Sequence, residues 1–471
     1  MSVISCHPSL FHDDKELYQL LLSCQEKALR QGQSVIVSLT QELEAIDPLA
    51  ILQTALKVNP KQLHFYWQNN RKQEAVTALG RTRYFTLTKG NRFQASQNFI
   101  QNCLQQTEIQ GDLDLPWAGP HFFTNFTFFE RNSRSFSPFP IATVFLPQLQ
   151  IVRQENRSIL VINLNIDPYL DIAEAIAQLQ RQITLLNQSH HLTLNDIAQG
   201  AATTQIQTAH PFKAAVTSAL KSIQAGHFSK IVLAHTLDAI APQPFHLVAS
   251  LDYLRQSHPD CYIFSVSNGK GTNFIGASPE RLISIQNQHL VTDALAGSSP
   301  RGKTTFEDAQ LTQKLLDNEK ERREHQAVSD FIYKRLCELG LRPQRSRLRV
   351  LKLSHIQHLW TPIQAELSDR IHPLDIIAKL HPTPAVAGVP TAISCEQIRH
   401  YEPFDRSLYA APLGWMNYQG NSEFIVGIRS AFIQDNRARL YAGAGIVAGS
   451  NPDKELAEVQ LKLQTMLKAL V

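Results

Sequence analysis

Cysteine is scarce in this sequence, and its spacing indicates neither a metal site nor a disulfide framework. The six cysteines are spread over the chain, and no two of them are spaced as C-x-x-C. That spacing is typical of zinc ligands, and dense cysteine pairs are typical of small secreted domains held together by disulfides. The sequence therefore predicts neither kind of site, and it favours a reducing compartment.

Long apolar runs and blocks of one charge are also missing. No apolar run approaches the about 20 residues that cross a bilayer, and the opening MSVISCHPSLFHDD lacks the regions of a secretory signal. The chain carries 45 basic and 41 acidic residues, a formal net charge of +4, without a Lys/Arg-rich block. We therefore expect a cytoplasmic protein that binds neither nucleic acid nor membranes.

The apolar content is that of a large globular protein. Apolar residues make up 43% of the 471 residues, which is enough for a substantial core. Short β-branched and aromatic runs such as KIVLAHTLDAI occur mostly as hairpins rather than in strand–helix–strand alternation. This pattern predicts an α+β fold with large antiparallel sheets. The polar stretch 187–210 is expected to connect two halves of the chain.

Three segments in the second half have clear local signals. Residues 304–340 carry a helical apolar stripe and predict one long helix. Residues 380–392, LHPTPAVAGVPTA, contain three prolines in thirteen positions and predict a rigid loop. Near the end of the chain, Pro452 suits the first turn of a closing helix, with Ser450 or Asn451 as its cap.

Two glutamates interrupt the stripe of the helix predicted over 304–340. Glu324 lies four residues before Val328 and seven before Phe331, which places it on the apolar face, and Glu321 lies one turn earlier. A solvated stretch is the ordinary interpretation, because DNEKERREHQ has seven charged residues in ten. The other interpretation is that both carboxylates project into a polar cavity, where they would suit Mg²⁺.

Three further ionisable residues lie in apolar strand patterns. Lys230 opens KIVLAH, Glu280 lies in IGASPERLISI, and Arg429 lies in FIVGIRSAFI on the face of Ile425 and Ala431. The ordinary interpretations are a lysine that reaches solvent, a solvated glutamate on an edge strand and a buried ion pair. The chemical interpretations are a base whose pKa is lowered by burial, a carboxyl kept protonated by burial, and a guanidinium that binds a carboxylate.

The closing helix contains a pair of charges with an everyday explanation. Glu458 points away from the apolar stripe that includes Val459 and Leu463, and Lys462 follows four residues later. This is the favourable orientation for a Glu–Lys pair, which stabilises a helix by about 0.3 kcal/mol. Taken alone, Glu458 and Lys462 indicate a surface pair, with Glu455 one turn before them.

Taken together, these segments resemble the chorismate-utilising enzymes, which include the isochorismate, salicylate, anthranilate and aminodeoxychorismate synthases. The resemblance covers residues from about 210 to 471 in order. It is carried by FSKIVLAH, GASPERL, ALAGSSPRG, NEKERREH, HLWTPIQ, LHPTPAVAG, EPFDRSLYAAPLGW, FIVGIRSA and YAGAGIVAGSNPDKELAEVQLKL. It implies one α+β unit with a sandwich core of sheets, helices outside, and an active site between two subdomains. Residues 1–205 would be a divergent part of that fold, and 206–471 the chorismate-binding catalytic region.

The resemblance assigns catalytic and binding roles position by position. Lys230 matches the lysine that activates water, and Glu280 matches the general acid that protonates the leaving 4-hydroxyl. Leu456 departs from the family, which often has tryptophan there, and we expect only a change in packing. The positions that match the lining of the chorismate site are Gly297, His358, Ala385, Tyr409, Arg429, Gly443, Gly445 and Lys462.

The resemblance also implies Mg²⁺ as the cofactor. Glu324 and Glu458 match its ligands, while Glu321 and Glu455 match the outer carboxylates that hold metal-bound waters. In this view the two glutamates of the closing helix are no longer a surface feature, and Lys462 is assigned to a substrate carboxylate rather than to its helix neighbour. Gly443 and Gly445 would offer backbone N–H groups to the ligand.

Three positions bear on which family member this chain resembles. Ala296 stands where aminodeoxychorismate synthases carry a nucleophilic lysine, and Lys230 stands where anthranilate enzymes have glutamine. Ala385 stands where salicylate synthases tend to have threonine. Since no glutaminase segment is visible, we expect no obligatory glutaminase subunit. Isochorismate synthase is therefore the implied activity, salicylate synthase is the alternative, and the use of the product for a quinone, a siderophore or salicylate stays open.

A non-catalytic chorismate-binding protein belongs to another functional class. Such a protein would be expected to have lost an acid, a base or a metal ligand. The acid, the base and the metal carboxylates are all present in this sequence, which argues against it.

Overall fold

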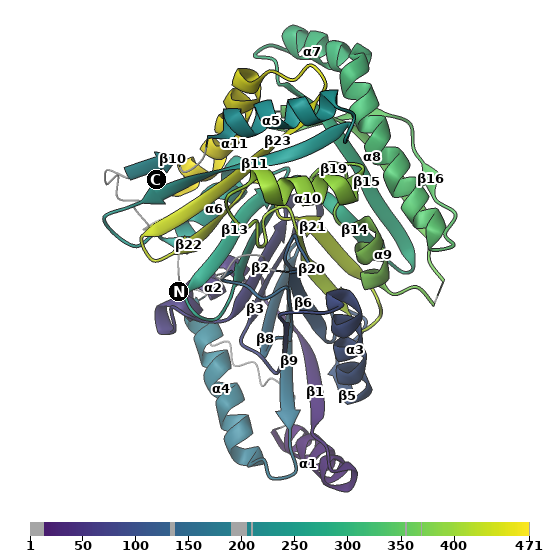
Figure 1. Cartoon of the computed structure of the whole chain (residues 1–471). Helices are drawn as coiled ribbons and strands as arrows, with labels where there is room; N and C mark the ends of the chain where they lie inside the picture. The colour runs from purple at the N-terminus through teal and green to yellow at the C-terminus, as the bar shows by residue number, and fades with distance from the viewer. Residues whose placement is uncertain are drawn as a thin grey trace.

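The computed structural model describes residues 14–131, 137–189, 205–208, 211–353, 356–368 and 370–470. In these ranges the strands form two sheets (Figure 1), called here sheet A and sheet B. Sheet A contains, in spatial order, β10 (Gln205–Thr208), β11 (Lys230–Ile240), β23 (Arg437–Val447), β22 (Ser430–Gln434), β13 (Thr272–Ser278), β12 (Tyr262–Ser267), β2 (His64–Asn69), β3 (Glu74–Leu79), β8 (Leu149–Gln154), β9 (Arg157–Ile166), β1 (Val35–Leu43) and β5 (Thr107–Gly111), with β19 (Gly388–Val389) beside β11.

Sheet B contains, in spatial order, β16 (Gln344–Arg345), β18 (Ile356–Glu366), β15 (His289–Pro300), β14 (Arg281–Gln286), β21 (Ser422–Val426), β20 (Pro412–Asn417), β6 (His121–Phe126), β7 (Ala142–Leu146) and β4 (Arg83–Leu87), with β17 (Arg349–Lys352) on β18. The α-helices are α1 (Asp14–Gln31), α2 (Pro48–Val58), α3 (Arg92–Gln105), α4 (Ile172–Ser189), α5 (Phe212–Gln224), α6 (Leu247–Ser257), α7 (Thr305–Asp317), α8 (Glu319–Glu338), α9 (Pro373–Leu380), α10 (Thr391–Tyr401) and α11 (Pro452–Leu470).

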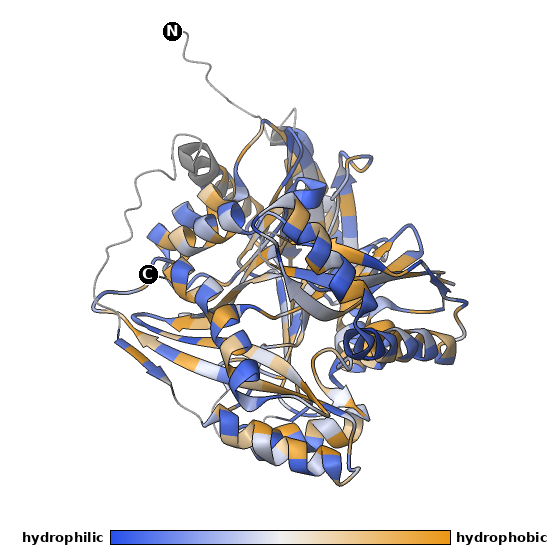
Figure 2. Ribbon diagram, turned by 90° about the horizontal axis from the view of Figure 1, so that it is seen from above, coloured by the Kyte–Doolittle hydropathy of each residue, from blue (hydrophilic) through white to orange (hydrophobic). Residues whose placement is uncertain are grey.

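The two sheets pack face to face and confirm the predicted α+β class. Among the described strands every pairing except that of β1 with β5 is antiparallel. Phe65 of β2 and Phe123 of β6 touch across the layers, with ring centroids 5.0 Å apart. Helices surround the sheets, and Figure 2 shows hydrophilic and hydrophobic residues interleaved along them, as expected for helices with one buried face. None of the described helices is long and apolar enough to cross a membrane.

Both sheets continue through the two halves of the chain. In sheet A, β12 pairs with β2, and in sheet B, β20 pairs with β6. The strands from residues 14–189 therefore belong to the same two sheets as the strands of the second half. The connection expected over 187–210 falls mostly outside the described residues, apart from the end of α4 and strand β10.

The prediction of a single helix over 304–340 is wrong, because the helix is interrupted at Asn318, between α7 and α8. Asn318 has extended backbone angles, φ −74° and ψ 108°, and its side-chain oxygen accepts a hydrogen bond from the N–H of Glu321 at 3.1 Å. An asparagine that caps a helix in this way competes with continuation of the preceding helix. The break places Glu321 and Glu324 in the first two turns of a new helix.

Arg429 also differs from its prediction, because it is not inside a strand. It lies between β21 of sheet B and β22 of sheet A, at the point where the chain crosses from one layer to the other. Its φ of +49° belongs to the left-handed region, which strands do not use. The expected shared face with Ile425 and Ala431 is therefore wrong, since those two residues belong to different sheets.

A buried ion pair joins the segment after α10 to strand β11. Arg406 and Glu402 are both at least 98% buried, and the guanidinium donates to both carboxylate oxygens. Arg406 also donates to the carbonyl oxygens of Val386 (2.9 Å) and Val232 (2.7 Å), and the N–H of Ala234 donates to Glu402 (2.7 Å). The pair thus satisfies backbone groups of two separate segments.

Arg406→Met is expected to lower the free energy of unfolding by about 3–5 kcal/mol, because it leaves the Glu402 carboxylate buried without a cation. Arg439→Met is a matched control, since Arg439 makes a two-bonded pair with Asp238 (2.7 and 2.8 Å) that is 43% exposed on the arginine side. This control should cost about 0–1 kcal/mol. Urea unfolding at unchanged slope measures both, and equal losses would contradict the proposed importance of the buried pair.

Candidate active site

One cavity brings together every candidate site residue named from the sequence. Its volume is about 210 Å³, and it lies between strands β11 and β23 of sheet A and strands β15 and β18 of sheet B, beside α8 and α11. The lining residues all fall between 230 and 462, so the cavity is enclosed by the two sheets and not by the two halves of the chain. The candidates on its wall are Lys230, Glu280, Gly297, Glu321, Glu324, His358, Ala385, Tyr409, Arg429, Gly443, Gly445, Glu455, Glu458 and Lys462.

Lys230, the first residue of β11, is 4% exposed and does not reach solvent. Its Nζ donates to Oε1 of Glu324 at 2.5 Å. Burial acts to raise the pKa of Glu324, but the positive charge and hydrogen bond of the adjacent Lys230 outweigh this effect. The pKa of the Glu324 carboxyl is therefore below its usual value. A Cβ on Gly445 would stand 3.1 Å from Glu324 Oε1 and 3.2 Å from Lys230 Cε, so Gly445 leaves room for this contact.

Lys462 of α11 makes the ordinary helix contact as well as facing the cavity. Its Nζ lies 2.7 Å from Oε1 of Glu458, four residues earlier, and donates to the carbonyl oxygen of Gly443 at 2.9 Å. Lys462 therefore contacts its helix neighbour here, and its assignment to a substrate carboxylate stays a prediction. Lys462 can contact Glu458 and line the cavity at the same time, because the face of α11 opposite its apolar stripe borders the cavity.

Glu321 and Glu455 are the outer pair of carboxylates. Burial raises the pKa of Glu321, and so do the charges of Glu324 and Glu458; burial also raises the pKa of Glu455, with Glu458 adding to the shift. The N–H of Ser298 donates to Glu321 Oε2 at 3.0 Å. Like charges that repel one another in this way create a place where a cation is stabilised.

A bulge in β15 shapes this side of the wall. Opposite β18 the register shifts between Ala296 and Ser298, and Gly297 between them has φ +78°. A Cβ on Gly297 would lie 3.1 Å from Glu321 Oε2. A glycine in the left-handed region is typical of such bulges, and here it lets the strand pass close to α8.

The carboxylate oxygens are ligands of the type that a hard divalent cation prefers, although the carboxylates do not converge on a single position. Mg²⁺ prefers oxygen ligands and is commonly held by one or two carboxylates with waters. Among the described residues, no group of three or more His, Cys, Asp or Glu side chains is close enough to hold a metal ion. Glu324 and Glu458, the two expected ligands, are each in contact with a lysine.

Glu280 lies in the short link between β13 and β14, is 7% exposed, and faces the same cavity. Burial raises the pKa of Glu280 to about 7, while nearby Lys230 opposes the shift and Asp293 adds to it. Its backbone N–H donates to the hydroxyl of Ser278 at 3.2 Å. A solvated glutamate is therefore excluded at this position, and the carboxyl can hold a proton near neutral pH.

His358 and Arg429 supply groups for recognising a polar ligand. The Nδ1–H of His358 donates to the carbonyl oxygen of Gly297 at 3.3 Å, and its Nε2 is buried without a hydrogen-bond partner in the described chain. Burial, with Arg429 and Lys462 close by, lowers the pKa of His358 to about 3. The ring is therefore neutral, and Nε2 is an acceptor. Arg429 makes one weak contact, from Nη1 to Cys261 Sγ at 3.8 Å.

Sequence reasoning missed Lys320, which also lines the cavity. It lies between Glu319 and Glu321 in the first turn of α8, and its charge lowers the pKa of Glu324 and opposes the increase at Glu455. The signal was available in the charged run NEKERREH, but the helical face of Lys320 depends on where α8 begins, and the break at Asn318 was not predicted.

Comparison with known proteins gives a consistent result. The family model described as "Chorismate binding enzyme" matches residues 22–471. The chain is 30% identical over 459 residues to isochorismate synthase MenF of Bacillus subtilis, covering 96% of each protein. It is 32% identical over 459 residues to the salicylate biosynthesis isochorismate synthase of Pseudomonas aeruginosa, covering 94% of this chain and 93% of the relative.

Solved structures show the same fold. The menaquinone-specific isochorismate synthase MenF from Escherichia coli aligns with a TM-score of 0.77 and 26% identity, over 96% of this chain and 100% of the other. Anthranilate synthase component I from Streptococcus pneumoniae aligns with a TM-score of 0.69 at 19% identity, over 84% of this chain and 92% of the other, which shows likeness of fold alone. With a family model matched over residues 22–471, the chain belongs to the chorismate-binding enzymes.

Proposed function

We propose that this protein is an isochorismate synthase, an isomerase that converts chorismate to isochorismate. The observation that carries the proposal is the cavity itself, where a buried lysine and a buried carboxyl with raised pKa face the same space as four further carboxylates. Two relatives that align over nearly their whole length are named isochorismate synthases.

In the proposed reaction Lys230 and Glu280 divide the proton transfers. Lys230 takes a proton from a water molecule as that water attacks C2 of the ring, the ring double bond shifts, and Glu280 gives a proton to the departing C4 hydroxyl. One water is consumed and one is released, so the reaction is an isomerisation. The raised pKa of Glu280 suits the acid role, because the carboxyl retains its proton near neutral pH.

Chorismate carries two carboxylates and a hydroxyl, and the cavity contains groups that complement both kinds. Arg429 offers a planar guanidinium that suits a carboxylate, and Lys462 offers an ammonium group. The unpaired Nε2 of neutral His358 is an acceptor for a hydroxyl. A buried acceptor without a partner is costly unless a ligand satisfies it, which supports a binding role for His358.

Glu324 and Glu458 would hold Mg²⁺, with Glu321 and Glu455 holding its waters. When bound, the ion would draw electron density from the ring carboxylate as the hydroxyl leaves. The oxygen-only donor set and the mutual repulsion of these carboxylates support this cofactor.

Product analysis tests the proposal and separates it from its relatives. Purified protein is incubated with chorismate and Mg²⁺, with and without ammonium, and the products are separated by chromatography. We expect isochorismate in both reactions. Salicylate with pyruvate would instead identify a salicylate synthase, and an amino product would refute both assignments. Absence of turnover, with the chain folded, would leave a chorismate-binding protein.

Loss of either proton-transfer group should abolish most of the activity without unfolding the protein. Lys230→Ala and Glu280→Gln are each expected to lower kcat by about 10²–10⁴-fold. Because the acid must be protonated, kcat/KM of the wild type should fall tenfold per pH unit above a midpoint near pH 7, the pKa of Glu280. Steady-state rates from pH 5.5 to 9 measure this, and full turnover by Lys230→Ala would contradict the mechanism.

Metal dependence is the next expected outcome. Excess chelator should remove activity, and added Mg²⁺ should restore it, because two carboxylates of the site would lose their shared cation. Glu458→Gln should be inactive at any Mg²⁺ concentration that saturates the wild type. Full activity in excess chelator, followed in the same chromatographic assay, would rule out the metal assignment.

A further inference from the structure

Each of the two carboxylates assigned to the metal is in contact with a lysine assigned to another task. Glu324 accepts from Lys230, the proposed base, at 2.5 Å, and Glu458 lies 2.7 Å from Lys462, a proposed substrate ligand. The two pairs come from four different parts of the cavity wall, β11 with α8 and two successive turns of α11. The repetition of one arrangement at both ligands suggests a shared purpose.

We propose that Lys230 and Lys462 act as counter-ions of the metal carboxylates, so that a divalent cation binds only by displacing both ammonium groups. Displacement frees Lys462 for a substrate carboxylate. It also frees the ammonium group of Lys230, which gives one proton to solvent and can then, as the neutral amine, take a proton from the attacking water. The inference rests on the proposed function, because it takes the metal ligands and the roles of the two lysines from it. It goes further by making metal binding the event that frees both lysines.

Charge balance supports the exchange. The cavity wall carries the cations Lys230, Lys320, Arg429 and Lys462 against the carboxylates Glu321, Glu324, Glu455 and Glu458. A divalent cation placed beside ammonium groups that still hold the same carboxylates would be repelled by them, since like charges a few ångströms apart disfavour each other. Moving the ammonium groups away removes that repulsion and leaves Lys462 positioned to meet a carboxylate of the arriving dianion.

Gly445 of β23 gives the Lys230 side chain room to move. The Cβ that Gly445 lacks would stand 3.2 Å from Cε and 3.7 Å from Nζ of Lys230. Lys462 contacts the same strand, where it donates to the carbonyl oxygen of Gly443 at 2.9 Å. Among the described residues neither ammonium group has a second carboxylate within 4 Å, so each has one ion pair to break.

The two pairs differ in burial, which predicts a ranking. The side chains of Lys230 and Glu324 are 5% and 16% exposed, whereas those of Lys462 and Glu458 are 26% and 39% exposed. Water and salt weaken an exposed pair far more than a buried one. Lys230 should therefore compete with the metal more strongly than Lys462.

Metal binding without chorismate tests the proposal directly. Mn²⁺ is the probe, and its free concentration is followed by electron paramagnetic resonance during titration of each protein. Lys230→Met should bind Mn²⁺ about tenfold or more tightly than the wild type, and Lys462→Met about threefold more tightly, because each variant removes one competing cation.

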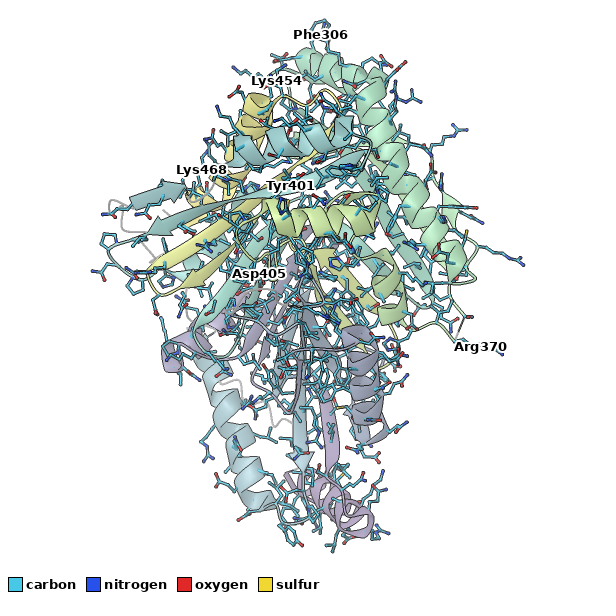
Figure 3. All side chains as sticks on the ribbon, viewed as in Figure 1. Phe306, Arg370, Tyr401, Asp405, Lys454 and Lys468 are labelled. Atoms are coloured by element: carbon cyan, nitrogen blue, oxygen red, sulfur yellow. The ribbon has the colours of Figure 1, made fainter. Side chains whose placement is uncertain are left out.

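Two control variants separate ion-pair competition from a general loss of positive charge. Lys320→Met removes the same charge from the same cavity, yet Lys320 has no ion pair within 4 Å in the described chain, so a smaller gain is expected. Lys454→Met removes an exposed charge at the start of α11 (Figure 3) that does not line the cavity, and this variant should bind Mn²⁺ like the wild type.

Lys230→Arg guards against effects of misfolding, since arginine keeps the charge beside Glu324 and should bind Mn²⁺ within about twofold of the wild type. The proposal is overturned if Lys230→Met and Lys462→Met gain no more than Lys320→Met, if Lys230→Arg gains as much as Lys230→Met, or if the wild type binds no Mn²⁺. Turnover is measured separately. A protein that makes isochorismate but fails these titrations keeps the proposed function, and one that passes them without turnover loses it.

Discussion

The guanidinium of Arg406 is the point at which three parts of the active-site wall are held together. It pairs with Glu402, and it also donates hydrogen bonds to two carbonyl oxygens, of Val232 in β11 and of Val386 in the proline-rich loop. Lys230 lies two residues before Val232, and Ala385 lies next to Val386. A buried charge with all its hydrogen bonds satisfied fixes geometry more firmly than apolar packing alone, because any displacement leaves a donor without an acceptor.

Within this wall, two carboxyl groups lie in environments that shift their pKa values differently. Glu280 is buried beyond the reach of a close cation pair and keeps its proton near neutral pH, whereas Glu324, equally part of the wall, is held charged by Lys230. The pKa values of two carboxyls in one cavity are thus shifted in opposite directions. The difference comes from the position of one ammonium group, 2.5 Å from Glu324. A single lysine side chain therefore influences the pKa of both carboxyls at once.

Local sequence patterns predicted much of this fold and part of the site. Hairpin spacing gave the antiparallel α+β class, and helical spacing placed Glu324 on the same face as the buried Val328. Helical spacing also showed that Glu458 avoids the apolar stripe of α11. It could not show that Glu458 and Glu324 face one cavity, because that proximity is set by how α11 and α8 pack on different sheets. The family resemblance supplied this link.

The errors share a physical cause. Strand assignment to a sheet is not written in the local pattern: β7 and β8 are separated by two residues, yet they belong to different sheets. Arg429 was misplaced for the same reason, since it lies at a crossing between layers. Lys320 was missed because its orientation depends on the helix break at Asn318, where one capping hydrogen bond outweighs the propensity of the surrounding residues.

The pairings of β2 with β12 and of β6 with β20 have a consequence for how such a chain can change over generations. The described residues of 14–131 and 137–189 contribute no side chain to the cavity wall, so their sequence can vary widely while the strands keep their apolar faces. Their loss would be another matter, because it would bare long edges of both sheets, and unpaired strand edges recruit other chains. The first half of the chain can therefore tolerate many substitutions, but it cannot be deleted.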